Sequence, residues 1–471
     1  MLQGTGSDVG KSVLVAGLCR AYANRGLKVR PMKPQNMTPN SVLADDGGEI
    51  GGAQALQALA CRIPSTSDMN PVLLKPTNDR SSALFVRGER RGTLGGNFRT
   101  ARAELLQVAL ESCRRLSDGA DLLLVEGAGS PAEINLRDGD IANMGFATAA
   151  DVPVLLVGDI ARGGVIAAIA GTRAVLDAPD AAQIRGFLVN KFRGDPALFA
   201  DGYRAIERLS DWRGYGVVPW LADAALLPSE DTLLLDPPRP AAGAALHIAC
   251  PLLPRIAHFD ALDALRAEPA IRFTMVPPGQ ALPRADCLLL PDSTAPVAAL
   301  RGLQQQGWDI DLRAHARQRR PIVGLGAGGQ LLGRSLRDGD GEAHAGLGLL
   351  PVHATSEDRL RRVRGTALHA RFAATLAAGI HCPEGAPPFA RFDDGGLEGM
   401  VDDDGRVLAT GLFDAFADTA LLGALLAWIG APSSGRPQRE IVDRALDRIA
   451  ATLEAHVDLD GLLALADGRE K

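Results

Sequence analysis

The chain has 471 residues, more than one hydrophobic core usually supports, so two or three domains are expected. Its 50 basic and 56 acidic side chains leave a net charge of −6, and only 4% of its residues are aromatic. This composition argues against nucleic acid or an anionic membrane surface as a partner, and base-stacking surfaces are not expected.

The cysteines and the hydropathy pattern are those of an intracellular protein. The six cysteines are scattered without C-x-x-C spacing, which is typical of buried free thiols. The N-terminus lacks a signal-peptide pattern, and the sequence holds no uncharged apolar run of about 18 residues that would span a membrane. We therefore expect a cytoplasmic protein without a membrane partner.

Residues 4–12 read GTGSDVGKS, a glycine-rich loop of the phosphate-binding type. Backbone N–H groups of such a loop turn toward an anion, Lys11 reaches the outer phosphates, and the Ser12 hydroxyl can ligate Mg²⁺. Residues 13–24 have helical apolar spacing, so the loop opens onto a helix N-terminus, where negative charge is favoured. The spacing G-x5-GKS is one residue longer than in the common loop. A nucleoside triphosphate is predicted to bind through Gly6, Ser7, Asp8, Val9, Gly10, Lys11 and Ser12.

Apolar runs alternate with helical segments through the first half. The runs 121–129, 152–160 and 184–192 predict buried parallel strands, and 102–116 predicts a helix. Such alternation is typical of an α/β fold with a doubly wound parallel sheet, which binds its ligand at the carboxyl ends of the strands. Because only three residues precede the phosphate loop, the first strand is short, or the chain starts further upstream.

Polar side chains at strand ends are candidates for the chemistry. Glu126 ends a predicted strand between glycines, where a carboxylate can hold Mg²⁺ or orient an attacking group; an ordinary surface acid is the alternative. Asp45 and Asp46 lie in DDGGEIG and either add a Mg²⁺ contact or form a polar turn. Lys33 ends the second strand and can place a cation near the transferred phosphate.

Asn190 and Lys191 lie at the end of the predicted strand 184–192, a position where purine bases are often read. We therefore add both residues to the expected nucleotide site.

The second half begins after a proline-rich segment. Residues 236–245 predict a linker between a domain at 1–235 and a domain at 246–471. A second set of strand-like runs follows it: 246–254, 271–278, 285–292 and 321–329. Beyond about residue 350 the pattern weakens to one predicted strand, 406–414, and two closing helices.

Several motifs of the first half together resemble the cobyric acid synthase family. They are GTGSDVGKS, KPQNM (33–37), DGGEIG followed by Ala53 and Gln54, DMNPVLLKP (68–76), VEGAGSPAEINLRDGDIANM (125–144), DIARGGV (159–165) and NKFRGD (190–195). The resemblance covers residues 1 to about 235. It implies a dethiobiotin-synthetase-like ligase domain followed by an α/β class I glutamine-amidotransferase-like domain, acting in cobalamin biosynthesis.

The resemblance also implies the reaction. The family amidates the b, d, e and g carboxylates of the corrinoid adenosylcobyrinate a,c-diamide, with ATP and Mg²⁺ as cofactors. The γ-phosphoryl group of ATP would activate each carboxylate, and ammonia would displace phosphate from the acyl phosphate.

Residue roles follow from the matched motifs. The expected catalytic residues are Lys11, Lys33 and Glu126. The expected Mg²⁺ ligands are Ser12 and Glu126, with Asp46 as a further candidate. The residues expected to face the corrinoid or the acyl phosphate are Asn36, Asn70, Lys75, Asn135, Arg137 and Asp140.

The second half departs from the family pattern at three places. The strand-to-helix elbow GLGAGGQLLG (324–333) has Gly326 where the family has its cysteine nucleophile, and LATGLFD (408–414) has Thr410 where the base should be. The segment usually reading LPGSK is here residues 290–294, LPDST. Cys382 follows His381, but neighbouring side chains on an extended chain point apart. We expect a domain that does not hydrolyse glutamine, so that the ligase uses free ammonia or a separate ammonia donor.

Three alternatives stay open. A related ligase would amidate the a and c carboxylates of cobyrinate, although KPQNM and INLRDGDIANM favour the first substrate. A partition-type ATPase would carry an early signature lysine where this chain has Gly6. A non-catalytic homologue is the third, and the intact Lys11, Ser12 and Glu126 argue against it. The oligomeric state is also open, and a homo-oligomer is compatible with the sequence.

Overall fold

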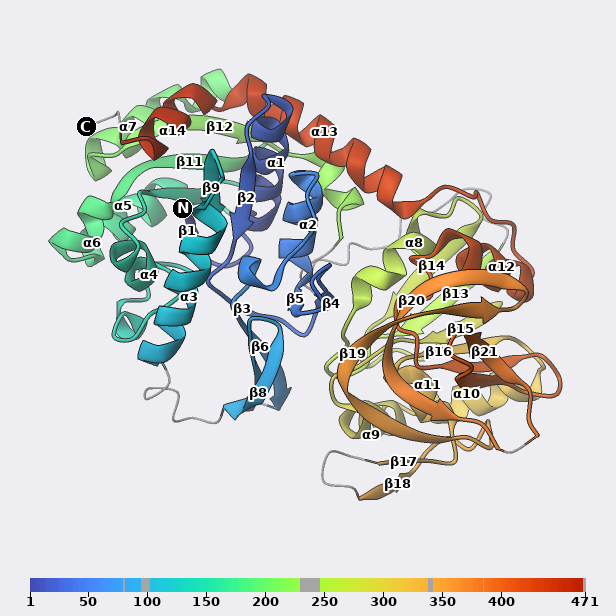
Figure 1. Ribbon diagram of the computed structural model, residues 1–471. Coiled ribbons are helices and arrows are strands. Elements are labelled where there is room, and N and C mark those ends of the chain that lie inside the picture. Colours follow the sequence, from blue (N-terminus) through green and yellow to red (C-terminus); the bar gives the residue numbers. More distant parts are fainter. Residues whose placement is uncertain (79–80, 95–101, 229–245, 338–341, 384, 469–471) are drawn as a thin grey trace.

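The computed structural model describes residues 1–78, 81–94, 102–228, 246–337, 342–383 and 385–468. These form two α/β modules (Figure 1), as the sequence predicts. The expected linker, 236–245, lies outside the described residues. All six cysteines lie within the described ranges as free thiols, with Cys382 half-buried and the others buried. Every described helix is too short or too polar to pass through a bilayer.

A parallel sheet forms the centre of the first module. Its strands run in the order β1 (Leu2–Gly4), β10 (Val154–Asp159), β11 (Ile184–Phe192) and β12 (Arg213–Pro219). The parallel pair β2 (Val29–Met32) and β9 (Leu122–Val125) continues the sheet, because Leu2 bridges Glu126 just after β9. The doubly wound parallel sheet is confirmed, and its carboxyl edge collects the phosphate loop and the residues after β2, β9 and β11.

Helices cover both faces of this sheet because its strands are apolar on both sides. In β10, Leu155 and Val157 pack into one core, and Val154 and Leu156 pack into the other. The helices of the first half are α1 (Lys11–Asn24), α2 (Gly52–Ala60), α3 (Arg102–Ser117), α4 (Met144–Ala149), α5 (Val165–Val175), α6 (Ala178–Gln183) and α7 (Ala200–Ser210).

Two small β structures lie beside the main sheet of the first module. One is the sheet of β3 (Gln35–Met37), β6 (Val72–Asn78), β7 (Ser81–Val86) and β8 (Glu89–Leu94). The other is the hairpin of β4 (Ser41–Leu43) and β5 (Glu49–Gly51). The β4 strand lies against β19 of the second module, where Arg362 donates to the Leu43 carbonyl oxygen at 3.1 Å.

The second module has a mixed sheet. Its parallel part has the order β14 (Ile271–Val276), β13 (Leu246–Pro251), β15 (Cys287–Leu290), β16 (Ile322–Leu325) and β23 (Val407–Thr410). These are the predicted strands. Its helices include α8 (Asp263–Ala267), α9 (Pro296–Gln305), α10 (Trp308–Arg317) and α11 (Ala327–Leu332).

The antiparallel extension of this sheet was not predicted from the sequence. The extension contains β17 (Ser335–Arg337), β18 (Ala343–Ala345), β19 (His353–Ala367), β20 (Ala370–His381), β21 (Pro388–Phe392) and β22 (Leu397–Val401). Along β19, Arg361, Arg362 and Arg364 are exposed, whereas Val363 and Gly365 are buried, and these arginines weaken the apolar signal of the strand.

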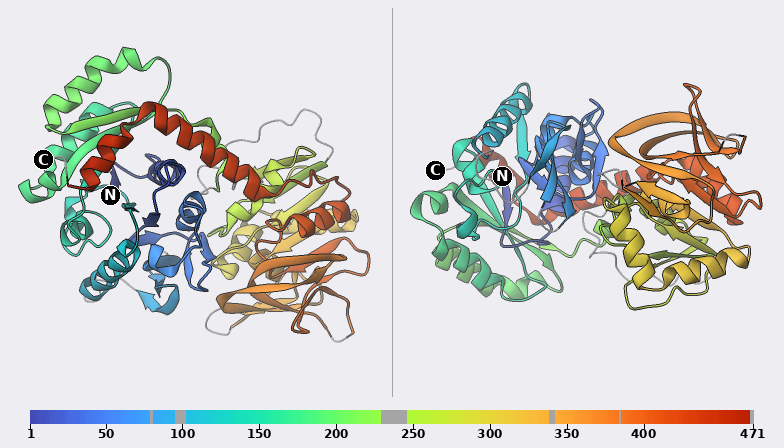
Figure 2. Two further views of the ribbon diagram at one scale, coloured as in Figure 1. Left: turned by 45° about the horizontal axis from the view of Figure 1, so that its top comes forward. Right: turned by 90° about the horizontal axis from the view of Figure 1, so that it is seen from below.

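The chain closes with three helices rather than two: α12 (Thr419–Ile429), α13 (Gln438–His456) and α14 (Leu459–Ala466). Of these three helices, α12 contributes to the core of the second module. Helix α13 returns to the first module and lies along α1 (Figures 1 and 2). Buried Arg20 of α1 pairs with Asp443 at 2.5 Å and Asp447 at 2.9 Å. The segment expected to end the second domain thus completes the core of the first.

This packing predicts a stability effect. Leu453 of α13 is fully buried against Gly17, whose added Cβ would lie 2.6 Å from Leu453 Cδ1. We expect Leu453→Ala to lower the free energy of unfolding by about 2–5 kcal/mol, because it leaves a cavity in the first core. Urea unfolding measures the change. The control is Leu198→Ala, a side chain that is 87% exposed, which should change stability by less than about 0.5 kcal/mol. Equal effects of the two variants would contradict this packing.

Candidate active site

The phosphate loop connects β1 to α1 and folds as the motif requires. Gly10 has a φ of 94°, and a Cβ there would lie 2.5 Å from Asn190 Nδ2, so this position needs glycine. Lys11 Nζ donates to the carbonyl oxygens of Gly6 at 3.0 Å and Gly129 at 3.1 Å. The ammonium group therefore lies across the loop and ties it to the segment after β9, where outer phosphates bind in such loops.

Glu126 is the centre of the site and is 1% exposed. Its Oε1 accepts from Ser12 Oγ and Lys33 Nζ, each at 2.8 Å, and its Oε2 accepts from Gln57 Nε2 at 2.5 Å. A buried carboxylate needs such donors, and Lys33 also supplies the opposite charge. The contact between a hydroxyl and a carboxylate gives the oxygen ligands that Mg²⁺ prefers, so these residues fit that ion.

Gln57 is a site residue that was not predicted from the sequence. It lies on α2, three residues after Gln54, and both side chains are fully buried. Residues three apart share a helix face, so α2 presents Gln57 to Glu126 and Gln54 to Asn36, whose Nδ2 donates at 3.1 Å. The sequence signal that could have identified Gln57 is the pair of glutamines, three residues apart, on an otherwise apolar helix.

Asn190 and Lys191 lie behind the phosphate loop. Asn190 Nδ2 donates to the Val9 carbonyl oxygen at 2.8 Å, and Lys191 Nζ bonds to the Asp8 carbonyl oxygen and to Asp159 Oδ2, the latter at 2.9 Å. Within the described residues, Asn190 Oδ1 is buried without a hydrogen-bond partner. Both residues thus brace the loop, and Asn190 keeps one acceptor for a ligand.

Two of the expected substrate residues lie next to the Glu126 cluster. Asn70 Nδ2 donates to the carbonyl oxygen of Lys33 at 3.2 Å, and its Oδ1 accepts from the Gly51 N–H at 3.0 Å. Asn36 joins the same group through Gln54. The structure therefore brings Asn36 and Asn70 together with Lys33.

Lys75 has a partner of its own. Its Nζ forms an ion pair with Glu49 Oε1 at 2.5 Å and lies 5.5 Å from the centre of the Phe85 ring. Ser41 Oγ donates to the same carboxylate oxygen at 2.5 Å. Lys75 is therefore positioned by the β4–β5 hairpin.

Asp46 forms a polar turn, the alternative raised by its motif. Its Oδ2 accepts from the backbone N–H and the hydroxyl of Ser67, at 2.7 and 2.9 Å. The neighbouring Asp45 binds Ser65 in the same way, with its Oδ2 accepting at 2.9 and 3.0 Å. No described contact joins Asp46 to Ser12 or Glu126, so the structure does not bring this Mg²⁺ candidate to the site.

Three more expected substrate residues follow β9. Arg137 forms a two-pronged ion pair with Asp180, at 2.6 and 2.9 Å, which raises the pKa of the guanidinium. Asp140 accepts three backbone N–H bonds at 2.8–3.0 Å at the start of α4. Asn135 is exposed. The first two residues shape this loop, and no described contact joins any of the three to Lys11 or Glu126.

The second module has the strand-to-helix turn on which the family carries its nucleophile, but a glycine occupies the nucleophile position. Gly326 lies between β16 and α11 with φ 53° and ψ −124°, a conformation that costs other residues free energy. A Cβ added there would lie 2.4 Å from Asp292 Oδ1. Asp292 holds this position firmly, because its Oδ1 accepts from the Ala327 N–H at 2.7 Å and its Oδ2 lies 2.6 Å from His258 Nδ1. The Asp292 carboxylate therefore fills the space that the Cβ of any larger residue at position 326 would need.

The expected base position is also filled. Thr410 Oγ1 donates to Glu398 Oε2 at 2.7 Å, and the Gly411 N–H donates to Oε1 at 2.6 Å. Burial raises the pKa of Glu398 to about 7. Burial also raises the pKa of Cys382 to about 11, so its thiolate, the nucleophilic form, is scarce at neutral pH.

Glu398 predicts a pH dependence of stability. Because its folded-state pKa is raised from 4.5 to about 7, the folded state binds a proton that the unfolded state has lost within this range. The contribution of Glu398 to the free energy of unfolding therefore falls as pH rises from 4.5 to about 7, by an amount on the order of 2–3 kcal/mol. Urea unfolding of the wild type and Glu398→Gln at several pH values should show a difference with this slope. A difference that is constant with pH would contradict it.

The fold and this site define a class: a P-loop nucleotide-binding domain joined to a glutamine-amidotransferase-like domain. Residues 1–234 match the CobQ/CobB/MinD/ParA nucleotide binding domain, and residues 247–417 match the CobB/CobQ-like glutamine amidotransferase domain. The chain is 58% identical over 477 residues to a cobyric acid synthase of Rhizorhabdus wittichii, covering 99% of this chain and 98% of that one. It is 57% identical over 478 residues to that of Sphingopyxis alaskensis, with coverage of 99% and 98%.

The chain belongs to the cobyric acid synthase family, whose members are ATP-dependent amide ligases of cobalamin biosynthesis. Its P-loop domain implies that ATP is used. A crystal structure of a glutamine amidotransferase is similar at a TM-score of 0.30 and 16% identity, covering 43% of this chain and 98% of that one. That structural likeness is too weak to carry an argument.

Proposed function

We propose that this chain amidates the b, d, e and g carboxylates of adenosylcobyrinate a,c-diamide through acyl phosphates, with ATP and Mg²⁺, in the cytoplasm. The observation that supports it most is the buried cluster of Ser12, Lys33 and Gln57 around Glu126, next to the phosphate loop. A scaffold that only kept the fold would not need a buried lysine–glutamate pair at this edge.

Charge neutralisation is the main task of the phosphoryl-transfer step. Lys11 would neutralise the outer phosphates. Lys33, directly after β2, would place a second positive charge near the transferred phosphoryl group. Ser12 and Glu126 would hold Mg²⁺, which supplies positive charge between the phosphates when bound. Asp46 is placed in a turn and is the weaker ligand candidate.

The corrinoid would bind beside Asn36 and Asn70, the latter bonded to the Lys33 backbone, and beside Lys75, which pairs with Glu49 of β5. Asn135, Arg137 and Asp140 would act through the shape of the loop after β9. A side-chain carboxylate oxygen of the corrinoid would approach Lys33 and attack the γ-phosphorus. The bond between that phosphorus and the ADP oxygen would break, so that ADP leaves and the acyl phosphate stays in the site for ammonia.

We further propose that residues 246–471 include a glutaminase-like domain that does not hydrolyse glutamine. The clash between a thiol at Gly326 and Asp292 supports this, as does the bonding of Thr410 to Glu398. Nitrogen would then come from free ammonia or from a separate donor protein. The first domain, 1–235, would be completed by α13 and α14.

Oxygen-isotope transfer tests the acyl phosphate. With ATP, Mg²⁺, ammonium and a corrinoid whose free carboxylates carry ¹⁸O, one labelled oxygen should appear in inorganic phosphate for each amide formed. Hydrolysis of ATP without transfer of ¹⁸O to phosphate would contradict the proposed route.

A further inference from the structure

The proposed function leaves unexplained a group of titratable side chains in the second module. His258 is 4% exposed, and Asp292 is 8% exposed. The carboxylate of Asp292 can only accept hydrogen bonds, so His258 Nδ1 carries the hydrogen that it donates at 2.6 Å. In the neutral ring, the lone pair of His258 then lies on Nε2.

Two acceptor atoms of this group lack donors. Across the described residues, no hydrogen-bond partner reaches His258 Nε2 or Asp260 Oδ1, although both atoms are buried. Buried polar atoms without partners are costly, so a donor is expected to approach them. Asp260 and Asp414 are close enough to His258 to interact with it electrostatically, and burial raises the pKa of both carboxyls. A ligand at these atoms would have to bring hydrogen-bond donors, and positive charge would favour it.

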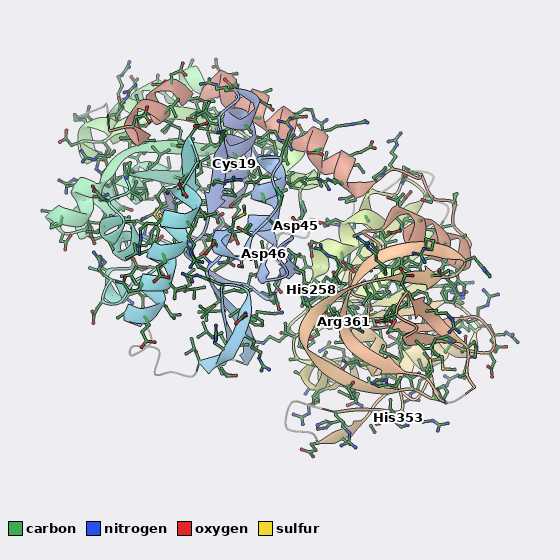
Figure 3. The ribbon with its side chains drawn as sticks, viewed as in Figure 1. Cys19, Asp45, Asp46, His258, His353 and Arg361 are labelled. Carbon is green, nitrogen blue, oxygen red and sulfur yellow. The ribbon has the colours of Figure 1, made fainter. Side chains whose placement is uncertain are left out.

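The group lies at the contact between the modules. Asn40 of the first module lies just before β4, and its side chain hydrogen-bonds to Asp260 of the second module. Thr294, which follows the Asp292 strand end, donates to the Pro76 carbonyl oxygen at 3.3 Å, next to Lys75. Figure 3 shows His258 at the side of the second module that faces the first.

We propose that His258, Asp260 and Asp292 form an ammonium-binding site that supplies the ligase with ammonia. Ammonium fits because it is small and cationic and carries only hydrogen-bond donors, which His258 Nε2 and Asp260 Oδ1 lack among the described residues. One N–H bond of ammonium breaks, its electron pair stays on nitrogen, and the proton bonds to His258 Nε2. Asp292 stabilises the imidazolium, and neutral ammonia leaves toward the acyl phosphate. This inference rests on the proposed use of ammonia.

The test is the ammonium dependence of corrinoid amidation by the full chain, with ammonium chloride as the probe. We expect His258→Gln and Asp260→Asn each to lower kcat/KM for ammonium about 10- to 100-fold, the effect of losing a hydrogen bond to a charged group, while KM for ATP stays within about twofold. The matched control is His247→Gln. His247 is also buried in this module, but its ring nitrogens already have partners in Arg272 and Thr274, so kcat/KM for ammonium should not change.

The outcomes separate the two proposals. Unchanged kcat/KM for ammonium in both site variants overturns the ammonium site while leaving the ligase intact. The ammonium site is also overturned if potassium chloride inhibits with a constant equal to the KM for ammonium, because potassium brings no donors. A wild type that forms no amide from ammonium overturns the proposed function itself. If His258→Gln lowers Tm strongly, the kcat/KM for ammonium of the isosteric variant Asp260→Asn decides whether the ammonium site exists.

Discussion

Glu126→Gln is expected to lower the rate of corrinoid-dependent phosphate release from ATP about 10²- to 10³-fold, the loss typical of removing one charge-stabilising group from a preorganised site. The amide keeps the shape of the side chain but loses the negative charge that pairs with Lys33 and is proposed to hold Mg²⁺. The variant should also be less stable, because Lys33, which is 6% exposed, would be left with an uncompensated charge.

Phosphate release measured over a range of Mg²⁺ concentrations checks this expectation. The control is Glu104→Gln, an exposed glutamate in the first turn of α3, which should behave as the wild type. Activity of Glu126→Gln within about threefold of the wild type, a change worth less than about one kcal/mol, would contradict the role given to Glu126.

Gly326→Cys is expected to give no glutamate from glutamine, even though it returns a thiol to the elbow. The new side chain must adopt φ 53° and ψ −124°, which costs about 1–3 kcal/mol. It must also displace Asp292, which costs about 1–3 kcal/mol more through overpacking. The expected result is therefore a less stable protein without glutaminase activity.

A double-mutant cycle shows whether Asp292 is the obstacle. Adding Asp292→Gly to Gly326→Cys should recover about 1–3 kcal/mol relative to the sum of the single changes, because the two side chains compete for one space. Urea unfolding of the four proteins gives this coupling. Additive effects would mean that Asp292 does not occupy the position of the thiol, and glutamate release by Gly326→Cys alone would contradict the proposed loss of glutaminase activity.

Local patterns predicted the two α/β modules well. Buried parallel strands such as β10 and β11 carry continuous apolar runs, and the phosphate loop carries its own signature. The β19–β20 hairpin was missed, and in β19 the exposed arginines at 361, 362 and 364 interrupt the apolar pattern of a strand. The packing of α13 on the first module could not be predicted, because the apolar face of an amphipathic helix does not identify the core against which it packs. In the structure, the missing side chain of Gly17 on α1 leaves space for Leu453.

The residues of the candidate site were predictable where a motif carried them. Ser12, at the start of α1, and Lys33, after β2, both bond to Glu126, as expected for groups at the carboxyl edge of one parallel sheet. Single polar residues such as Gln57 or His258 have no motif, so only the structure shows that they lie beside Glu126 and Asp292.

Other motif residues serve the structure. Arg137 and Asp140 lie in a motif as specific as the phosphate loop, yet their described partners are Asp180 and the backbone of α4. A motif shows that residues belong together but does not separate those that touch a ligand from those that shape the loop.

The central claim is that the first module activates a corrin carboxylate with ATP, whereas the second module does not hydrolyse glutamine. Mass spectrometry of the corrinoid product tests it most directly, after reaction with ATP, Mg²⁺ and equal amounts of ¹⁵N-ammonium and unlabelled glutamine. We predict ¹⁵N in every new amide. Amides without ¹⁵N would contradict the claim, because their nitrogen would come from glutamine.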